Sequence, residues 1–488
     1  MRYKILSVFA ALAAVTACGD LTSINQNPNG PVDVPPPSIL PSVIQTVVGS
    51  VDGVNSLNIR GGGLWVQYYS EIQYRDEDKY IVRSGTSGGW GLYNSALEDV
   101  QRMIRKGVAS NAANWSAVGR ILKSYTFSVM TDAMGDLPYS QALKGDTLLT
   151  PAYDTQQQIY NGMLADLAQA NTEIDTASGA VGFSSGDLMY GGDMAQWKKF
   201  ANSLRLRLAI HLSIKDPTKA ATEAAAAVAA GVFTSNADNA TLQYLATSPN
   251  RNPIYNDAQG RDDYGLSKTY VDSLTSWADP RLPVFAQPNP AGTGYQGLPN
   301  GLNDGEGTPI VNISRFGTFW RSTAAAPMDL LTYSEVLFLQ AEAAERGWIP
   351  GGSAAAATFY NNAITASMDQ YGVGAGAAAY LAQAKVGYDA AGATLAGHLR
   401  QIAYQKWVSL FMQGMEAWTE VRRTQIPLLV PGPRAPVGMA GVPGRIPERL
   451  PYDDNEAVLN KVNLDAAVAA QGFTQGNDIT KPLWFTGR

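Results

Sequence analysis

The sequence is poor in the residues that most often build metal centres, disulfides and nucleophile–base pairs. It has one cysteine and two histidines among its 488 residues. A single cysteine cannot form an internal disulfide and cannot supply a zinc site made of several thiolates. We therefore expect a fold stabilised by packing, with no metal site and no bound cofactor.

Charge and long apolar runs are scarce as well. Charged residues make up 16% of the chain, and the formal net charge is −6. Nucleic-acid binding needs a basic surface, so no nucleic-acid partner is expected. Beyond the N-terminus no run of about 18 residues is apolar enough to predict a transmembrane helix. Hydrophobic residues reach 45%, which is typical of a globular protein with a large core.

The N-terminus has the pattern of an export signal. Arg2 and Lys4 precede an apolar stretch, and small residues lead directly to Cys18. This arrangement predicts a lipoprotein signal peptide over residues 1–17 and lipid attachment at Cys18. The alternative is an ordinary cleavable signal followed by an incidental thiol. With the lipid, the protein would be anchored to a membrane and face a non-cytoplasmic space.

The segment after Cys18 is rich in proline and asparagine. Residues 21–41 include Asn-Pro-Asn-Gly-Pro and Val-Pro-Pro-Pro, which favour turns and extended chain. We therefore predict a lipidated, extended tether over residues 18–41, followed by a body over residues 42–488.

Most of the body has helical periodicity. Thr155 and Gln158 form a capping box before an apolar stripe, and a second stripe runs from Trp197 to Leu212. Ser353 is the predicted cap of a helix that pairs with the one before it, in a hairpin of tetratricopeptide size. We expect a helical scaffold over about 90–215 and 328–425.

A loop-rich part over about 250–327 interrupts this scaffold. Between Pro288 and Pro309, 13 of 22 residues are glycine, proline or asparagine. A second stretch rich in proline and glycine runs from Pro427 to Pro451. Long structured loops on a rigid scaffold usually carry function, so the first is the expected ligand-binding part.

Two motifs suggest catalysis or nucleotide binding, but their contexts do not fit. Gly85–Gly89 matches a nucleophile elbow, yet the available bases, His211 and His398, fall in predicted helices, where a buried structural role is favoured. Gly292–Gly297 matches a dinucleotide motif but lacks the strand and helix that such a site needs. Paired carboxylates for glycoside hydrolysis stay possible, although no spacing singles out a pair.

The remaining chemistry is that of sugar binding. Such a surface needs aromatic rings for the apolar faces of sugars and polar side chains for their hydroxyls. Around the glycines of residues 76–94, and in the loop-rich part, the predicted ligand-binding residues are Asp76, Arg83, Trp90, Asn94, Tyr295 and Trp320. The competing interpretation is that Trp90 and Trp320 anchor loop ends in the core.

A set of short motifs, in this order and spacing, resembles the SusD/RagB-type outer-membrane lipoproteins and is close to their starch-binding-associated branch. They are Ile24–Asn29, Thr131–Tyr139, Trp197–Arg207, Asp279–Pro283, Thr332–Val336, Ala341–Ala343, Gln405–Trp407, Gly414–Trp418, Arg422–Thr424 and Leu483–Trp484. The resemblance implies a mainly α fold of four tetratricopeptide-like helix pairs with an irregular loop-rich subdomain.

The resemblance also implies a function. It indicates a non-enzymatic, glycan-binding lipoprotein of the outer membrane that takes up nutrients with a SusC-like TonB-dependent transporter. The six ligand-binding residues are placed by region and not by motif. Peptide cargo, a surface glycosidase and a purely structural partner role stay open as alternatives.

Overall fold

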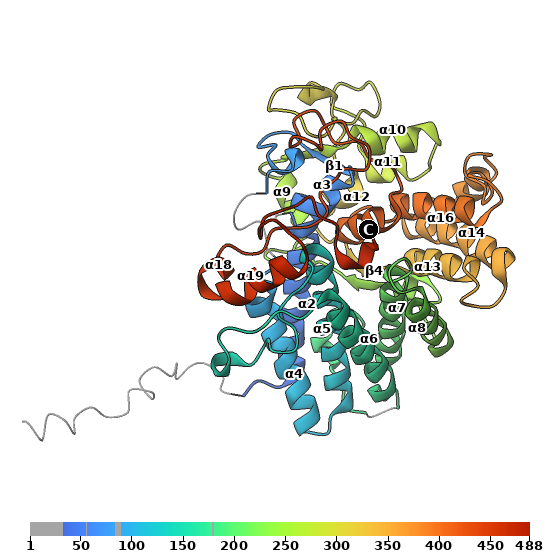
Figure 1. Ribbon diagram of the computed structural model, residues 1–488. Helices are drawn as coiled ribbons and strands as arrows, with labels where there is room; N and C mark the ends of the chain where they lie inside the picture. The colour runs from blue at the N-terminus through green and yellow to red at the C-terminus, as the bar shows by residue number, and fades with distance from the viewer. Residues whose placement is uncertain (1–32, 55, 83–88, 178–179) are drawn as a thin grey trace, which may run out of the picture.

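The computed structural model describes residues 33–54, 56–82, 89–177 and 180–488. The predicted signal peptide, Cys18, Arg83 and the motif at Gly85–Gly89 lie wholly or largely outside these residues. Helices dominate the described chain, and the strands form two small antiparallel sheets (Figure 1). The predicted mainly α fold is confirmed.

The long helices occupy two parts of the sequence. In the first part they are α2 (Pro36–Asp52), α4 (Glu98–Ala109), α5 (Ala113–Met134), α6 (Gln156–Glu173), α7 (Met194–His211) and α8 (Pro217–Ala230). In the second part they are α13 (Tyr333–Glu345), α14 (Gly352–Gln370), α16 (Leu395–Ser409) and α17 (Gly414–Thr424).

Shorter elements connect and cover these helices. The short α-helices are α3 (Gly63–Trp65), α9 (Pro253–Ala258), α10 (Lys268–Ser276), α11 (Leu282–Phe285), α12 (Thr318–Arg321), α15 (Ala377–Leu381), α18 (Glu456–Leu459) and α19 (Lys461–Ala470). The π-helical turns are η1 (Asn58–Gly62) and η3 (Tyr93–Leu97). The 3-10 turns are η2 (Glu77–Lys79), η4 (Gly145–Thr147), η5 (Ser184–Gly186), η6 (Asn236–Asp238), η7 (Ile310–Asn312), η8 (Gly374–Gly376) and η9 (Trp484–Thr486).

The helix α2 begins inside the predicted tether, so the tether boundary at residue 41 is wrong. Pro36 occupies the first turn, where its missing N–H and fixed φ are tolerated. The following stripe of aliphatic side chains, from Leu40 to Val51, is buried against the rest of the body. Burial of this stripe stabilises the helix despite Pro41 within it, whereas the local proline content alone favoured extended chain.

Helices that follow one another in the chain pack side by side as helical hairpins. In the first group α4 packs on α5, α5 on α6, α6 on α7 and α7 on α8, and in the second group α13 packs on α14 and α16 on α17. The pairs α4–α5, α6–α7, α13–α14 and α16–α17 are consistent with tetratricopeptide-like helix pairs. The capping box is confirmed, because Thr155 accepts from the amide of Gln158. The predicted cap at Ser353 is wrong: the residue before the helix is Gly351, and the Ser353 hydroxyl donates to Glu345 instead.

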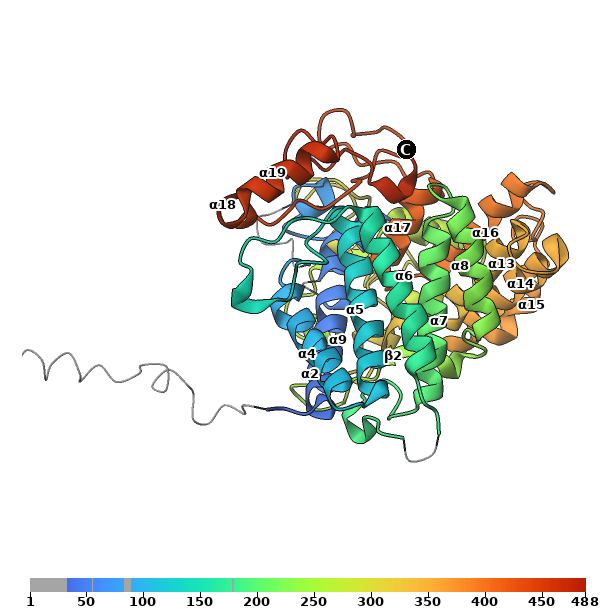
Figure 2. The same ribbon diagram turned by 60° about the horizontal axis from the view of Figure 1, so that its bottom comes forward.

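The C-terminal segment lies across one end of the first helix group (Figure 2). The Tyr452 hydroxyl donates to the carbonyl of Asp136 at 2.8 Å, and Asn460 donates to the carbonyl of Pro151. Segments that are more than 300 residues apart in sequence are therefore joined directly. In the described residues, no helix combines the length and apolar character needed to cross a membrane.

One sheet ties the loop-rich part to the N-terminal part, and the other joins the two segments that flank the loop-rich part. Strand β1 (Tyr69–Glu71) pairs with β3 (Tyr264–Leu266), so that Glu71 lies opposite Tyr264. Strand β2 (Ala240–Leu242) pairs with β4 (Met328–Leu331). The motif at Gly292–Gly297 lies in a loop between α11 and η7, as its context indicated.

Candidate functional site

The structure does not gather the predicted ligand-binding residues into one site. Trp320 is only 2% exposed and packs against Phe319, Phe411 and other rings of the core. A buried ring has no face available to a sugar, so Trp320 anchors the core and its predicted ligand-binding role is wrong. This was the competing interpretation for Trp320.

Trp90 belongs to a different aromatic cluster. Its ring stacks on Tyr153 at 6.2 Å and meets Tyr93 and Tyr452 edge-on. It is half-buried, so packing accounts for much of its surface. A ligand role for Trp90 stays a prediction.

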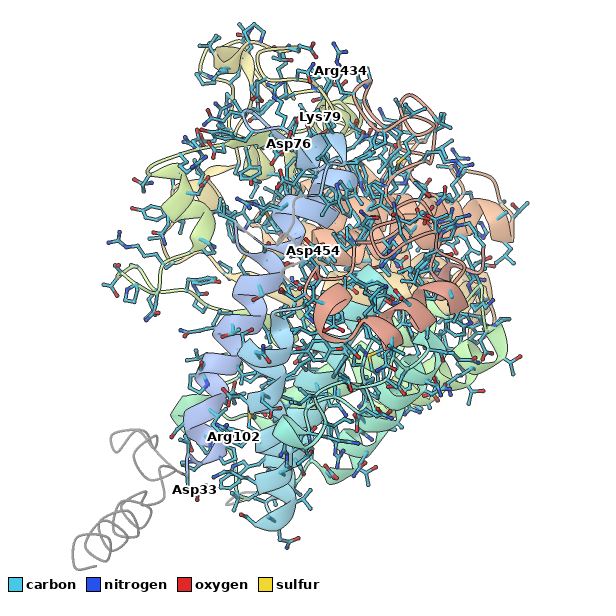
Figure 3. All side chains as sticks on the ribbon, turned by 60° about the vertical axis from the view of Figure 1, so that its left-hand side comes forward. Asp33, Asp76, Lys79, Arg102, Arg434 and Asp454 are labelled. Atoms are coloured by element: carbon cyan, nitrogen blue, oxygen red, sulfur yellow. The ribbon has the colours of Figure 1, made fainter. Side chains whose placement is uncertain are left out.

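The other predicted residues are more accessible. Asp76 pairs with Lys79 at 3.2 Å at the end of the molecule where Arg434 also lies (Figure 3). Asn94 is exposed on η3, and Tyr295 is half-buried in the loop after α11. Arg83 lies outside the described residues.

A groove with a better set of side chains lies where η1, β1, η2, β3 and α9 meet. We call it the Tyr74 groove. It consists of two hollows of about 480 and 500 Å³, which share Val54, Asp257 and Arg261. Its lining residues are Gly49, Gly53, Val54, Arg60, Glu71, Gln73, Tyr74, Glu77, Pro253, Asn256, Asp257, Gly260, Arg261, Asp263 and Tyr264.

Tyr74 is unusual among the aromatic residues. At 56% exposed it is the only aromatic side chain in the described ranges that is classed as exposed. Its backbone has φ 59°, the left-handed region that L-residues seldom adopt. Such conformations recur where a fold holds a side chain in place for binding, so Tyr74 is the first candidate for a ligand platform.

Neighbouring residues hold this platform in position. The Arg261 guanidinium lies 5.2 Å from the centre of the Tyr74 ring, and its Nε donates to Asp263 at 2.6 Å. The other carboxylate oxygen of Asp263 accepts from the side chain of Gln73. The pairing of β1 with β3 brings residues 73 and 74 next to residues 261–263, although they are far apart in sequence.

The groove also holds a carboxyl group with an altered proton affinity. Partial burial raises the pKa of Asp257 to about 6, and repulsion from Asp263 and Asp262 adds to this effect. Asp262 itself accepts from Arg315 at 2.9 Å and Arg321 at 2.8 Å. The groove therefore combines an exposed ring, a guanidinium and carboxylates, which can stack on a sugar and bind its hydroxyl groups.

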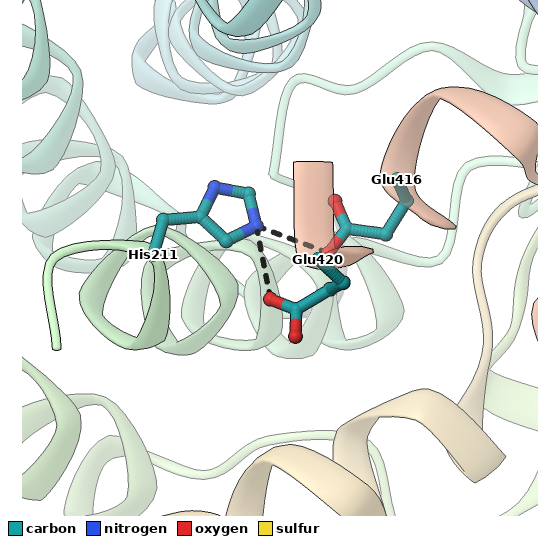
Figure 4. A group of neighbouring side chains, drawn as sticks. All are labelled: His211, Glu416 and Glu420. Atoms are coloured by element: carbon teal, nitrogen blue, oxygen red, sulfur yellow. Dashed lines mark hydrogen bonds and ion pairs between the residues drawn. The ribbon is translucent and has the colours of Figure 1, made fainter. Parts of the chain in front are cut away.

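A buried cluster of His211, Glu416 and Glu420 has donor atoms close enough for a metal ion (Figure 4). The His211 Nε2 lies 3.0 Å from Glu416 and 3.9 Å from Glu420. However, Lys406 and Arg423 each pair with Glu420 at 2.6 Å, and Arg207 lies 3.4 Å from Glu416. These cations already neutralise the carboxylates.

The protonation of His211 also argues against metal binding. Burial alone lowers the pKa of this imidazole, but the nearby carboxylates of Glu416 and Asp132 outweigh burial and raise it to about 10. A protonated imidazole has no lone pair for a metal. We therefore assign the cluster to the structural core, where it joins α5, α7 and α17, and not to a functional site.

The sequence analysis missed Tyr74, Asp257 and Arg261. The run from Gly260 to Tyr264 mixes glycine, charge and an aromatic residue, which is the same composition that drew attention to residues 76–94. That signal was available. The proximity of this run to Tyr74 was not, because strand pairing alone creates it.

Comparison with known proteins identifies relatives over most of the chain. Residues 28–453 match the SusD-like family model, described as starch-binding and associating with the outer membrane. A solved chitin-binding protein is 30% identical over 92% of this chain and 99% of its own, with a TM-score of 0.79. No curated protein matches the sequence.

Two further solved structures share the fold. A chitin-binding SusD homologue from Flavobacterium johnsoniae is 26% identical, with a TM-score of 0.81 over 92% of this chain and 98% of its own. A SusD homologue from Bacteroides fragilis is also 26% identical, with a TM-score of 0.79 over 93% of this chain and all of its own.

Proposed function

The chain belongs to the SusD-like family of outer-membrane proteins, and from this premise we propose that it captures oligosaccharides at the cell surface and delivers them to a TonB-dependent transporter. Membership supports glycan binding and an outer-membrane location. Delivery to a SusC-like transporter, anchoring through a lipid on Cys18 and the position of the glycan site are what we propose for this chain.

The observation that carries the proposal is the exposure of Tyr74 on the rim of a groove. A ring of this kind can contribute about 1–3 kcal/mol by stacking, by analogy with nucleic-acid bases on aromatic side chains. Hydrogen bonds from Arg261 and to Asp257 can then orient the hydroxyl groups. The entropy lost when the sugar and the side chains become ordered reduces the binding free energy. We therefore expect dissociation constants in the micromolar to millimolar range, which allow release to the transporter.

We propose binding without cleavage. Glycoside hydrolysis needs two carboxyl groups that flank the scissile bond, one of them able to give a proton. Asp257 has a raised pKa, but Asp263 is engaged by Arg261 and Gln73 and is poorly placed to act as its partner. This arrangement supports a binding site.

The relatives suggest which sugars to test first. Two of the similar structures are named as chitin-binding, and the family is described as starch-binding. We therefore propose glucose-type or glucosamine-type oligosaccharides as the cargo class. Peptide cargo is the alternative within the same uptake system.

Calorimetric titration of the full-length chain in detergent tests the site. Oligosaccharides from starch and chitin are titrated at neutral pH, and each mixture is analysed by chromatography for cleavage products. Saturable binding without products supports capture. Tyr74→Ala should weaken binding about tenfold or more, whereas Tyr74→Phe, which keeps the ring, should retain it.

Other results separate the alternatives. Binding that Tyr74→Ala leaves intact would place the site elsewhere, and cleavage products would identify an enzyme. Cys18→Ser tests the anchor: the variant should leave the membrane fraction, and wild-type protein should carry acyl groups detectable by mass spectrometry. Co-purification with a large outer-membrane barrel protein tests the transporter.

A further inference from the structure

Asp257 stands out among the charged residues of the Tyr74 groove. It lines both hollows of the groove, and no lysine, arginine or histidine of the described chain forms an ion pair with its carboxylate. Its carbonyl oxygen accepts hydrogen bonds from the amides of Gly260, Arg261 and Asp262, which fixes the turn after α9. The carboxylate is therefore held at the groove surface by this turn and by a hydrogen bond from the backbone amide of Asp263, and not by a counter-ion.

The neighbouring acids, in contrast, are engaged. Asp263 pairs with Arg261 and accepts from Gln73, while Asp262 accepts from Arg315 and Arg321. Glu71 accepts from the amide of Asp78 at 3.1 Å. Among Asp257, Asp262 and Asp263, only Asp257 forms no ion pair with a side chain of the described residues.

The groove as a whole is acidic. Four carboxyl groups line the hollow beside Tyr74, and two guanidinium groups face them: Glu71, Glu77, Asp257 and Asp263 against Arg60 and Arg261. A cationic ligand reduces the net negative charge of this hollow, whereas an anionic ligand increases it. The groove is therefore more suited to a cationic sugar than to an acidic one.

Building on the proposed function, we propose that the Tyr74 groove binds amino-sugar oligosaccharides with free ammonium groups, such as glucosamine units of deacetylated chitin. The Tyr74 ring contacts the apolar face of one sugar, and Asp257 accepts a charge-assisted hydrogen bond from an ammonium group. An N-acetylated unit has no positive charge for Asp257, and a glucose unit lacks the amine.

The surroundings of Asp257 give the binding a pH dependence. Burial and the charges of Asp263 and Asp262 disfavour its ionised form, Arg261 favours it, and Arg60, Glu71 and Glu77 face the same hollow. Binding of the ammonium group requires ionised Asp257. Because the sugar amine stays protonated at acid pH, affinity for the deacetylated sugar should decrease as the pH falls below about 6.

The test compares three hexasaccharides on the full-length chain in detergent: glucosamine hexamer, N-acetylglucosamine hexamer and cellohexaose. At pH 7 the wild-type chain should bind the glucosamine hexamer about tenfold more tightly than either neutral sugar, as expected for one charge-assisted hydrogen bond. Asp257→Asn should remove this preference, because it should weaken binding of the glucosamine hexamer about tenfold more than binding of either neutral hexamer. Asp465→Asn, the same change on exposed α19, should preserve the preference.

The outcomes distinguish this inference from the proposed function. Binding of the neutral hexamers with equal or higher affinity than the glucosamine hexamer overturns the inference but keeps glycan capture. A preference that persists in Asp257→Asn overturns the assignment of Asp257. No binding of any oligosaccharide contradicts the proposed function itself.

Discussion

Arg207 on α7 and Glu335 on α13 form a fully buried ion pair with two hydrogen bonds of 2.6 Å. The pair joins the two groups of long helices, and Arg207 also donates to the carbonyl of Leu330. Burial of both side chains means that removing one partner leaves the other charge without compensation.

We predict that Arg207→Met lowers the free energy of unfolding by about 3–5 kcal/mol. The matched control is Arg205→Met on the same helix, because Arg205 pairs with Glu223 at 2.6 Å but both side chains keep some contact with solvent. That change should cost less, because solvent can compensate the charge that remains. Urea denaturation of both variants measures the difference, and equal losses would contradict the central role of the Arg207–Glu335 pair.

Asp52, at the end of α2, is buried, and its Oδ2 has no hydrogen-bond partner among the described residues. Burial raises the pKa of this carboxyl group well above its usual value, and the charge of Asp329 raises it further. A folded-state pKa above the unfolded one makes the protein lose stability as the pH rises through the unfolded value near 4.

We therefore predict that Asp52→Asn is more stable than wild type at pH 7, and that the difference shrinks toward pH 4. Unfolding curves at several pH values test this expectation. Destabilisation of the variant at every pH would show that Asp52 is ionised and paired in the folded protein.

His211 should also make stability fall as the pH rises, but over a higher pH range than Asp52. Burial opposes its protonation, but Glu416 and Asp132 raise its pKa to about 10, compared with about 6.5 in an unfolded chain. The protonated imidazole therefore stabilises the fold below about pH 6.5, and this contribution disappears as the pH rises from there through about 10.

Comparison with His211→Gln isolates this contribution. At pH 6.5 the variant should melt at a clearly lower temperature than wild type, and the two melting temperatures should converge as the pH approaches 10. A difference that stays constant over this range would mean that His211 is neutral and contributes by packing alone.

Trp320 should affect stability and not ligand binding. Its ring is enclosed by Phe285, Phe319, Tyr371 and Phe411. Truncation in such a site costs about 3–5 kcal/mol, so Trp320→Ala should lower the unfolding free energy by this amount. The Trp320→Ala protein that stays folded should bind glycan with wild-type affinity. Loss of glycan binding without loss of stability would instead support a ligand-binding role for Trp320.

Local structure was largely predictable from the sequence. The apolar stripe of α7 and the capping box of α6 depend on residues three and four positions apart, and both form as expected. Predictions from local sequence were wrong where contacts with distant residues set the conformation. Residues Pro36–Pro41 are helical because the helix buries its apolar side. Ser353 does not cap its helix, because its hydroxyl donates to Glu345 of the preceding helix.

The candidate site was less predictable. Trp320 lies in the short helix α12 and Tyr74 in the turn after β1, and only the packing around each ring decides which one is covered. The partners of Tyr74 come from residues 261–263, which the pairing of β1 with β3 brings close. No periodicity or spacing in the sequence indicates that pairing.

The sequence by itself therefore determined the mainly helical scaffold and the short motifs that place the chain in its family, and it predicts an export signal that ends at Cys18. These depend on residues close together in the chain. The tertiary structure alone decided which aromatic ring is exposed, which carboxyl groups are paired and where the groove lies. The exposure of a ring and the pairing of a carboxyl group depend on contacts between segments up to hundreds of residues apart, and local sequence patterns do not predict those contacts.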